Sequence, residues 1–374
     1  MRSSLHPSIT AVILGAISIA WLAGPAAGQA NEFRLGQSSG RLSAEFTRVV
    51  GVRALADGRV LILDGGDNRM LIADFGRDSV ATVGGQGAGP GEYRRPFALA
   101  AIGRDSTVII DPGNRRWLVH AAGGVLQTLP PDYPATVATR GAARTGDGNG
   151  RLMVVGPPTI TEKTDRIGKG DSVVVTLVTI RSAAADTVAR LLASPVSMPK
   201  QFDAAGKVTR VDFITPPWAV GEEAMLFPDG WLGVARLEPY RVDWRTPAGE
   251  WVRGAPLPIA EVKAGPRERD AFLAAQQERT GRPAPQPPAD AWPAAVPPFQ
   301  PGPLVPAPDG TLLIRRTPTA DHPGDRYDRV DRQGRLVGWL ELPAGDRLIA
   351  AADGQAYVVR TDDDGIQRLL RYRW

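Results

Sequence analysis

Cysteine is absent from this chain of 374 residues, and histidine is scarce, with three in all. Without a thiol there is no cysteine nucleophile, no disulfide, no Cys-ligated metal and no lipid-modified cysteine behind a leader. His6 lies in the leader segment described below, which leaves His120 and His322. Two histidines do not make a histidine-rich zinc site. Because no G-x-S-x-G string occurs either, the sequence gives little support to a Ser-His-Asp hydrolase.

Lysine is also rare, with five in the chain, so that the basic residues are almost all arginine. The 44 basic and 40 acidic residues give a formal net charge of +4, and no run of Lys or Arg occurs. A nucleic-acid-binding protein usually carries a basic stripe that follows the phosphates. We therefore do not expect nucleic acid to be a partner.

The chain has a single long apolar run, ITAVILGAISIAWLA at residues 9–23. Arg2 precedes it, and the small residues Gly28 and Ala30 follow at the spacing of a cleavage site. Residues 1–30 are thus predicted to be a signal peptide cleaved after Ala30. An uncleaved anchor is the alternative, although a spanning helix needs about 20 residues. We expect a periplasmic or secreted monomer that does not span the membrane once the signal is removed.

Two copies of one sequence unit follow each other between Asp57 and Gly124. Each has a polar turn, an apolar run ending in Asp, a Gly/Asn loop with Arg, and a second apolar run. The turn acids Asp57 and Asp105 lie 48 residues apart. A repeat of about 40–50 residues is typical of propellers and solenoids. The short β-branched runs, which lack a helical period, favour a β-propeller.

The loop between the two copies carries a recognisable motif. Residues 85–96 read G-x-G-x-G-P-G-E-Y-x-x-P, and residues 111–116 read D-x-x-N-R-R after an apolar strand. This pattern resembles NHL-type six-bladed β-propellers, especially secreted bacterial propeller proteins of unassigned function. The match is close over about residues 50–130. The resemblance implies a fold and a loop-holding role for the Asp and Asn, but no activity, since propellers host many functions.

Six turns followed by apolar strands divide the chain into units. They begin at Asp57-Gly58, Asp105-Ser106, Asn149-Gly150, Asp229-Gly230, Asp309-Gly310 and Asp353-Gly354. Asp-Gly and Asn-Gly between apolar runs are strong hairpin signals. The prediction is an all-β fold in which residues 31–374 form one six-bladed propeller domain with four antiparallel strands per blade.

Two of the intervals between turns are long, at 80 residues each. The first holds the strand-like run 172–178, which predicts an elongated third blade. The second holds an insertion at 261–303, with a short helix over 268–279 and then a proline-dense segment. Proline cannot occupy a central strand, so we expect this segment to be an arm over one face, anchored by Trp292 and Phe299. A linker between two domains is the alternative.

The last unit supplies only three strands, RLIAAAD, QAYVVRT and IQRLLRYRW, before the chain ends. A strand at Glu32–Gly36 is predicted to complete this blade and close the ring, which would remove an exposed sheet edge.

Equivalent positions seven residues after the turn acid carry Asp64 in the first unit and Arg236, Arg316 and Arg360 in the last three. Asp111 stands one residue earlier in the second unit. Three converging arginines would bind an anion, because the guanidinium forms two-pronged contacts with carboxylate, sulfate or phosphate. Structural ion pairs between blades are the alternative. Asp64 and Asp111 have a second role available, which is to hold their own loops through backbone amides.

No cofactor is expected. The composition leaves a calcium site with oxygen ligands possible, as in propeller lactonases. Asp362, Asp363 and Asp364 could contribute ligands to it. The sequence thus predicts an exported propeller that binds an anionic ligand or a protein partner. Two alternatives stay open: a divalent-cation-dependent enzyme of the lactonase or lyase type, and a scaffold that docks partners through the Pro-rich residues 281–303.

Overall fold

The blades are built from apolar strands joined by the predicted turns. The structure is a computed structural model, and it describes residues 31–103, 106–121, 126–128, 142–158, 166–167, 171–180, 182, 184–197, 199–212, 214–302 and 304–374. The predicted signal peptide at 1–30 and the turn residue Asp105 lie outside these residues. No helix among the described residues has the length and apolar character needed to cross a membrane.

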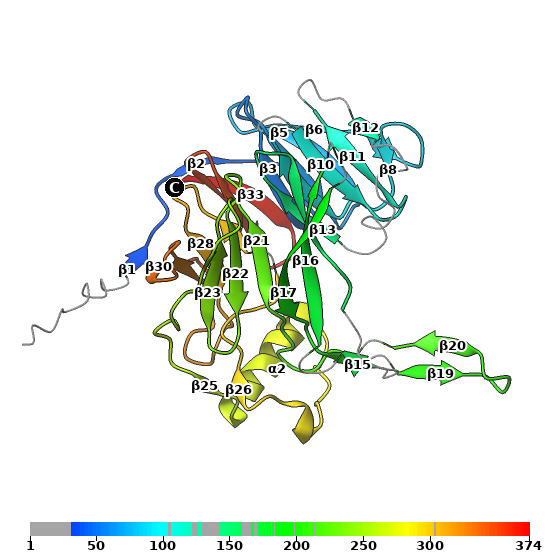
Figure 1. Ribbon diagram of the computed structural model, residues 1–374, viewed down its shortest axis with the longest axis vertical. Helices are drawn as coiled ribbons and strands as arrows, with labels where there is room; N and C mark the ends of the chain where they lie inside the picture. The colour runs from blue at the N-terminus through cyan, green and yellow to red at the C-terminus, as the bar shows by residue number, and fades with distance from the viewer. Residues whose placement is uncertain are drawn as a thin grey trace, which may run out of the picture.

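Six sheets form the blades of a six-bladed β-propeller (Figure 1), as predicted. Each blade has four antiparallel strands, and β1 (Asn31–Phe33) extends the sheet of the fifth blade to five strands. The first blade contains β3 (Val49–Ala54), β4 (Val60–Asp64), β5 (Arg69–Asp74) and β6 (Ser79–Thr82). The second contains β9 (Ala98–Ile102), β10 (Ser106–Asp111), β11 (Arg116–His120) and β12 (Leu126–Thr128). The third contains β13 (Ala142–Gly146), β14 (Arg151–Val155), β16 (Ser172–Thr179) and β17 (Ala185–Leu192). The elongated third blade is confirmed by the eight-residue strands β16 and β17.

The fourth blade contains β21 (Glu223–Leu226), β22 (Leu232–Arg236), β23 (Arg241–Arg245) and β24 (Trp251–Val252). The fifth contains β27 (Val305–Pro306), β28 (Leu312–Arg315), β29 (Arg326–Val330) and β30 (Leu336–Glu341). The sixth contains β31 (Asp346–Ala352), β32 (Gln355–Thr361), β33 (Gln367–Arg373) and β2 (Ser38–Arg41). The turn at Asp353-Gly354 shows why the turn signal works. Both residues have positive φ, 50° and 70°, which reverses the chain in two residues between β31 and β32.

The first strand of each blade lies innermost. The strands β3, β9, β13, β21, β27 and β31 contact one another in a ring, and the other strands of each sheet lie outside them. Buried aliphatic side chains fill the spaces between neighbouring blades; Leu61, Leu63 and Ile109 are examples from the junction of the first two. The apolar strands picked out by the sequence pattern are therefore second in their sheets, not innermost.

Ring closure is achieved by an N-terminal strand, but not by the one predicted. The strand β2 (Ser38–Arg41) pairs with β33, and Figure 1 shows the blue strand alongside the red one. The predicted segment Glu32–Gly36 instead overlaps β1 (Asn31–Phe33), which adds in parallel to β30 of the fifth blade. The apolar side chains explain the difference, because Leu42, just after β2, is fully buried in the core, whereas Phe33 and Leu35 pack against the fifth and sixth blades.

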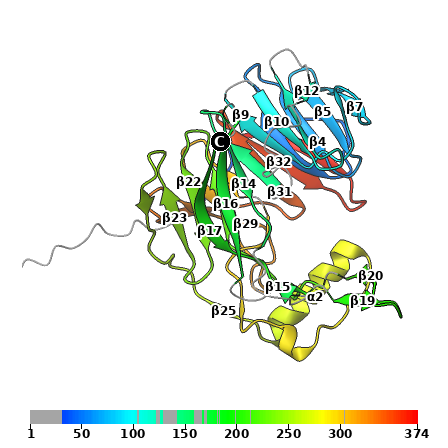
Figure 2. The ribbon, with the colours of Figure 1, turned by 45° about the vertical axis from the view of Figure 1, so that its right-hand side comes forward.

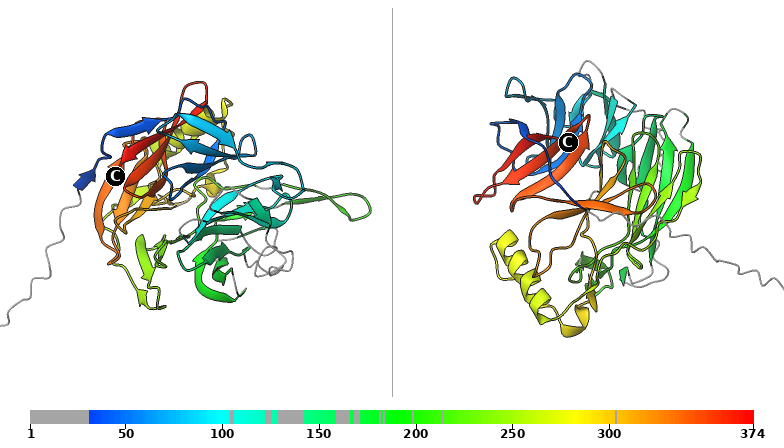
Figure 3. Two further views of the ribbon diagram at one scale, coloured as in Figure 1. Left: turned by 90° about the horizontal axis from the view of Figure 1, so that it is seen from above. Right: turned by 90° about the vertical axis from the view of Figure 1, so that its left-hand side faces the viewer.

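Four short pairs of strands lie outside the blades: β7 (Gly85–Gln86) with β8 (Glu92–Tyr93), β15 (Arg166–Ile167) with β18 (Val196–Ser197), β19 (Lys200–Phe202) with β20 (Val208–Val211), and β25 (Val262–Lys263) with β26 (Ala295–Val296). The hairpin β19–β20 projects from the molecule in Figure 1. The insertion at 261–303 holds β25, β26, the helix α2 (Pro266–Thr280) and the 3₁₀ turn η1 (Ala289–Ala291). Figure 2 and the right-hand view of Figure 3 show α2 to one side of the blades.

The closure can be tested by comparing two leucines. Leu42→Ala should lower the free energy of unfolding by about 2–5 kcal/mol, because it leaves a cavity at the junction of the first and last blades. Leu35→Ala, at a half-buried position, should cost at most about 1.5 kcal/mol. Urea unfolding measures both free energies. A larger loss of stability for Leu35→Ala than for Leu42→Ala would contradict closure by β2.

Candidate functional site

The two predicted acids hold loops. The carboxylate of Asp64 accepts hydrogen bonds from the backbone N–H groups of Thr47, Arg48 and Gly66 at 2.9–3.1 Å and forms an ion pair with Arg69 at 3.1 Å. Burial opposes its ionisation, but these donors outweigh that effect and keep its pKa below the usual range. Asp64 and the second predicted acid, Asp111, are both fully buried.

Asp111 has the same arrangement in the second blade. It accepts the N–H groups of Arg94 and Arg95 and, at 2.7 Å, the side-chain amide of Asn114. The amide of Asn114 also donates to the carbonyl of Gly87, which ties the Gly-rich loop to the blade. These contacts give both acids a structural role; their part in ligand binding stays a prediction.

All three predicted arginines form ion pairs with acids, and two of them do so through hydrogen bonds of 3.0 Å or less. Arg236 lies 2.7 Å from Glu222 and 3.0 Å from Asp243, and it donates to the carbonyl of Arg190 in the third blade. Arg360 forms a two-pronged pair with Asp346, with both contacts at 2.7 Å. The hydrogen bonds that Arg360 donates to Asp346 are the main reason why the pKa of Arg360 is raised. The structure shows ion pairs here, but they join residues of one blade and not of neighbouring blades as the alternative interpretation had it. Anion binding by these two arginines stays a prediction.

A cavity of about 1070 Å³ lies where the insertion meets the fourth and fifth blades, and Arg316 is the one residue of the five predicted that lines it. We call it the arm pocket. Its walls come from the segments 216–220, 237–240, 256–262 and 290–298 and from the loop after β28. These are crossovers and loops between second and third strands, so they share one face of the propeller.

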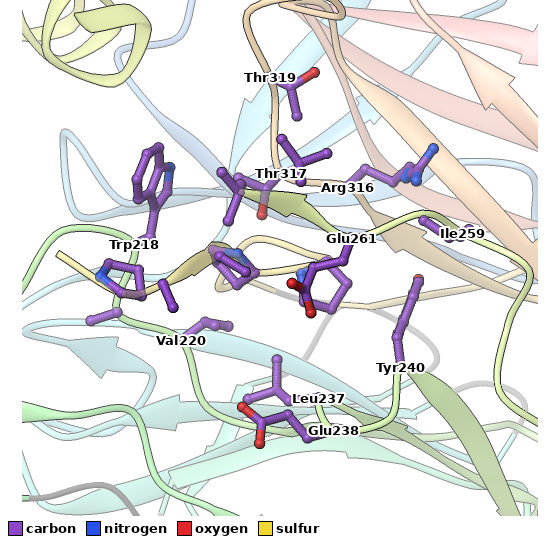
Figure 4. A pocket seen from close by; sticks show the side chains of 18 of the residues that line it. Trp218, Val220, Leu237, Glu238, Tyr240, Ile259, Glu261, Arg316, Thr317 and Thr319 are labelled. Carbon is purple, nitrogen blue, oxygen red and sulfur yellow. The ribbon is translucent and has the colours of Figure 1, made fainter. Parts of the chain in front are cut away.

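The walls of the arm pocket are largely apolar and rigid. Eight prolines line it, together with Trp218, Trp292 and Tyr240. Trp218 packs against Trp292 at a ring-centroid distance of 5.3 Å, and both contact Phe272 of α2. Phe299 is fully buried against Tyr240, so Trp292 and Phe299 do anchor the arm as predicted. In Figure 4, Trp218 lies at one end of the cavity and Arg316 with Tyr240 at the other.

The end that contains Arg316 is polar. The Nε of Arg316 lies 3.4 Å from the buried carboxylate of Asp328, which also accepts a hydrogen bond of 2.9 Å from the hydroxyl of Tyr240. Burial raises the pKa of Asp328 to about 6, against the opposing effect of Arg316 and the Tyr240 hydroxyl. Glu238 and Glu261 lie at the exposed rim.

The residues described here do not provide a cluster of three or more His, Asp or Glu side chains that could hold a metal ion. In the acidic loop considered for calcium, Asp362 is paired with Arg368 at 2.6 Å and accepts the N–H of Ile366. Its bond to Arg368 is the main reason why its pKa is lowered.

Sequence reasoning missed most of the arm pocket. Trp218, Tyr240 and Glu261 belong to three different segments, and only the fold brings these together. The available signal was the proline pairs Pro216-Pro217 and Pro297-Pro298, which mark rigid, non-strand walls.

No protein-family model matches the chain, and no curated protein is significantly similar to it in sequence. Similar solved structures include regucalcin, a calcium-binding protein from Agrobacterium tumefaciens, at 13% identity and a TM-score of 0.43, covering 92% of this chain and 97% of that one. Virginiamycin B lyase from Staphylococcus aureus matches at 13% and 0.39, covering 88% and 86%. A structural genomics protein of unknown function from Bacteroides thetaiotaomicron matches at 12% and 0.42, covering 92% and 73%. These values are too low to transfer a function to this chain.

The ion pair of Arg236 gives one prediction. Arg236→Gln removes the positive charge that pairs with both Glu222 and Asp243 and leaves these largely buried carboxylates without it. The free energy of unfolding should therefore fall by on the order of 2 kcal/mol. The control Arg59→Gln breaks an exposed pair with Asp57 and should cost less than about 1 kcal/mol. If chemical denaturation finds the two variants equally stable, the Arg236 pair is not structural.

Asp328 gives a pH-dependent prediction. Its pKa is higher in the folded than in the unfolded chain, so the stability that it contributes is present at low pH and is lost as the pH rises through about 6. Asp328→Asn removes this titration. The difference in unfolding free energy between variant and wild type should therefore shift in favour of the variant by on the order of 2 kcal/mol from pH 4.5 to 7.5. A difference that stays constant with pH would contradict the assignment.

Proposed function

We propose that the protein is an exported binding protein and that the arm pocket is its ligand site. The observation that carries the proposal is the cavity of about 1070 Å³ between the insertion and the blades. Ligand sites for small molecules are concave and mostly apolar, with a few polar groups that fix orientation, and they measure about 300–1,000 Å³. The arm pocket has this size and composition.

The ligand of the proposal is a small molecule with an apolar body and an anionic group. The apolar body is supported by the proline and aromatic walls, and the anion by Arg316 at the polar end. Export is supported by the predicted signal peptide at 1–30. This proposal keeps the anion of the sequence-based hypothesis and one of its three arginines.

The insertion forms a wall of the pocket in this proposal. The side chain of Gln300 donates to the carbonyl of Arg316, the backbone N–H of Ala320 donates to the buried Glu268 of α2 at 2.8 Å, and Arg267 pairs with Asp321. These contacts fix both ends of the insertion to the loop after β28. A segment held in this way supports a pocket wall better than a free docking arm.

A neutral fluorescent dye, N-phenyl-1-naphthylamine, tests the site. We expect saturable binding with increased emission, because the apolar walls exclude water from the dye. Ala260→Trp should weaken dye binding at least tenfold by filling the mouth of the pocket at an exposed lining position. Ala56→Trp places the same side chain near the β3–β4 turn, outside the pocket, and serves as the matched control. Failure of the dye to bind, or an equal loss in both variants, would reject the proposal.

A further inference from the structure

The polar end of the arm pocket contains two arginines that face each other. Arg316 follows β28 and Arg326 begins β29, and the backbone N–H of Arg316 donates to the carbonyl of Arg326 at 2.8 Å. The register of the two strands makes them directly opposite partners, and both line the cavity. Like charges at opposite positions of an antiparallel pair repel each other. The pair therefore needs negative charge nearby.

Three carboxylates act on these two guanidinium groups, and of these Asp328 is buried. Glu341 lies opposite Arg326 in the register of β29 and β30, and Glu341 and Glu32 are both exposed. Asp328 lies diagonally across from Arg316 on the same face of the strand pair, with its Oδ2 held by Arg316 and by Tyr240. Burial and the neighbouring Arg316 lower the pKa of Arg326, against the opposing effect of Asp328, Glu341 and Glu32. Asp328 is thus the buried carboxylate that the two arginines share, whereas Glu341 and Glu32 are exposed to solvent.

Three polar side-chain atoms at this end of the pocket lack a hydrogen-bond partner among the described residues. These are the Oγ1 of Thr317, the Nε of Arg326 and the Oδ1 of Asp328, and all three are buried. A buried donor or acceptor without a partner costs about 1–3 kcal/mol. The Nε of Arg326 and the Oγ1 of Thr317 can donate to an anion, whereas the Oδ1 of ionised Asp328 can only accept. Two buried donors without a partner at one end of a pocket are typical of a site that a ligand completes.

The other acids that line the pocket lie at its rim. Glu238, Glu261 and Asp290 are exposed at the rim, where water and salt screen their charges. Arg316, by contrast, has a side chain that is only 24% exposed. An anion at this end meets weak screening and two-pronged donors.

We propose that the arm pocket binds small apolar monocarboxylic acids, with the ligand carboxylate between Arg316 and Arg326 and its apolar body along the proline and tryptophan walls. This inference rests on the proposed function and makes it specific. A carboxylate is planar and matches the guanidinium fork, and its negative charge offsets the repulsion between the two arginines. A short apolar acid also fits the volume better than a folded partner would.

Competition against the bound dye in the wild-type protein tests the head group directly. Dodecanoate, dodecan-1-ol and dodecylammonium share one apolar chain and differ in charge. Dodecanoate should displace the dye at least tenfold more tightly than the alcohol, since charge-assisted hydrogen bonds form only with the acid. Equal affinities would overturn the inference and leave the binding site standing. A preference for dodecylammonium would overturn it as well, and would assign the selection to the acidic rim. A dye that does not bind at all rejects the proposed function itself.

Variants locate the head group. Arg326→Gln should reduce the affinity for dodecanoate at least tenfold and leave the alcohol unchanged, and Thr317→Val, which keeps the shape, should act in the same direction more weakly. The control Arg253→Gln changes an exposed arginine outside the pocket and should alter neither affinity. Melting temperatures confirm that each variant is folded. If Arg326→Gln proves unstable, Thr317→Val and the wild-type ligand series decide the question.

Discussion

A ring of six sheets has five covalent crossovers between blades, and its sixth junction has to be made without one. Here β2 supplies that junction by pairing with β33, and Leu42 buries itself between the first and last blades. The rest of the fold depends on this pairing, because it removes the edge of β33 and holds the six inner strands in a circle. Since the crossovers lie outside the circle, they can lengthen without disturbing it. The insertion between the fourth and fifth blades is such a crossover.

The sequence allowed the blades to be predicted because their signals are local. A turn such as Asp353-Gly354 needs positive φ wherever it occurs, so its position identifies a hairpin without knowledge of the neighbours. The closing strand was predicted at Glu32–Gly36, five to six residues too early, because the choice between two N-terminal strands depends on which leucine reaches the core. That information lies in the last blade and not in the strand itself.

The candidate site shows the same division between local and long-range information. Equivalent positions in the repeat led to Asp64, Asp111, Arg236, Arg316 and Arg360, and the structure places Arg316 alone of these in the arm pocket. The others are engaged by partners from their own or neighbouring blades, as Arg236 is by Glu222 and Asp243. Arg326 was not predicted, because its importance comes from the register that sets it opposite Arg316. Repeat position identifies a strand end, but not the charge that faces it.

The central proposal is that the arm pocket holds the carboxylate of an apolar ligand at Arg316 and Arg326. A crystal structure of the protein grown with dodecanoate tests it most directly. We expect electron density for the carboxylate between these two guanidinium groups, with the chain directed towards Trp218 and Trp292. Density against Arg236 or Arg360 with the arm pocket empty would contradict the proposal.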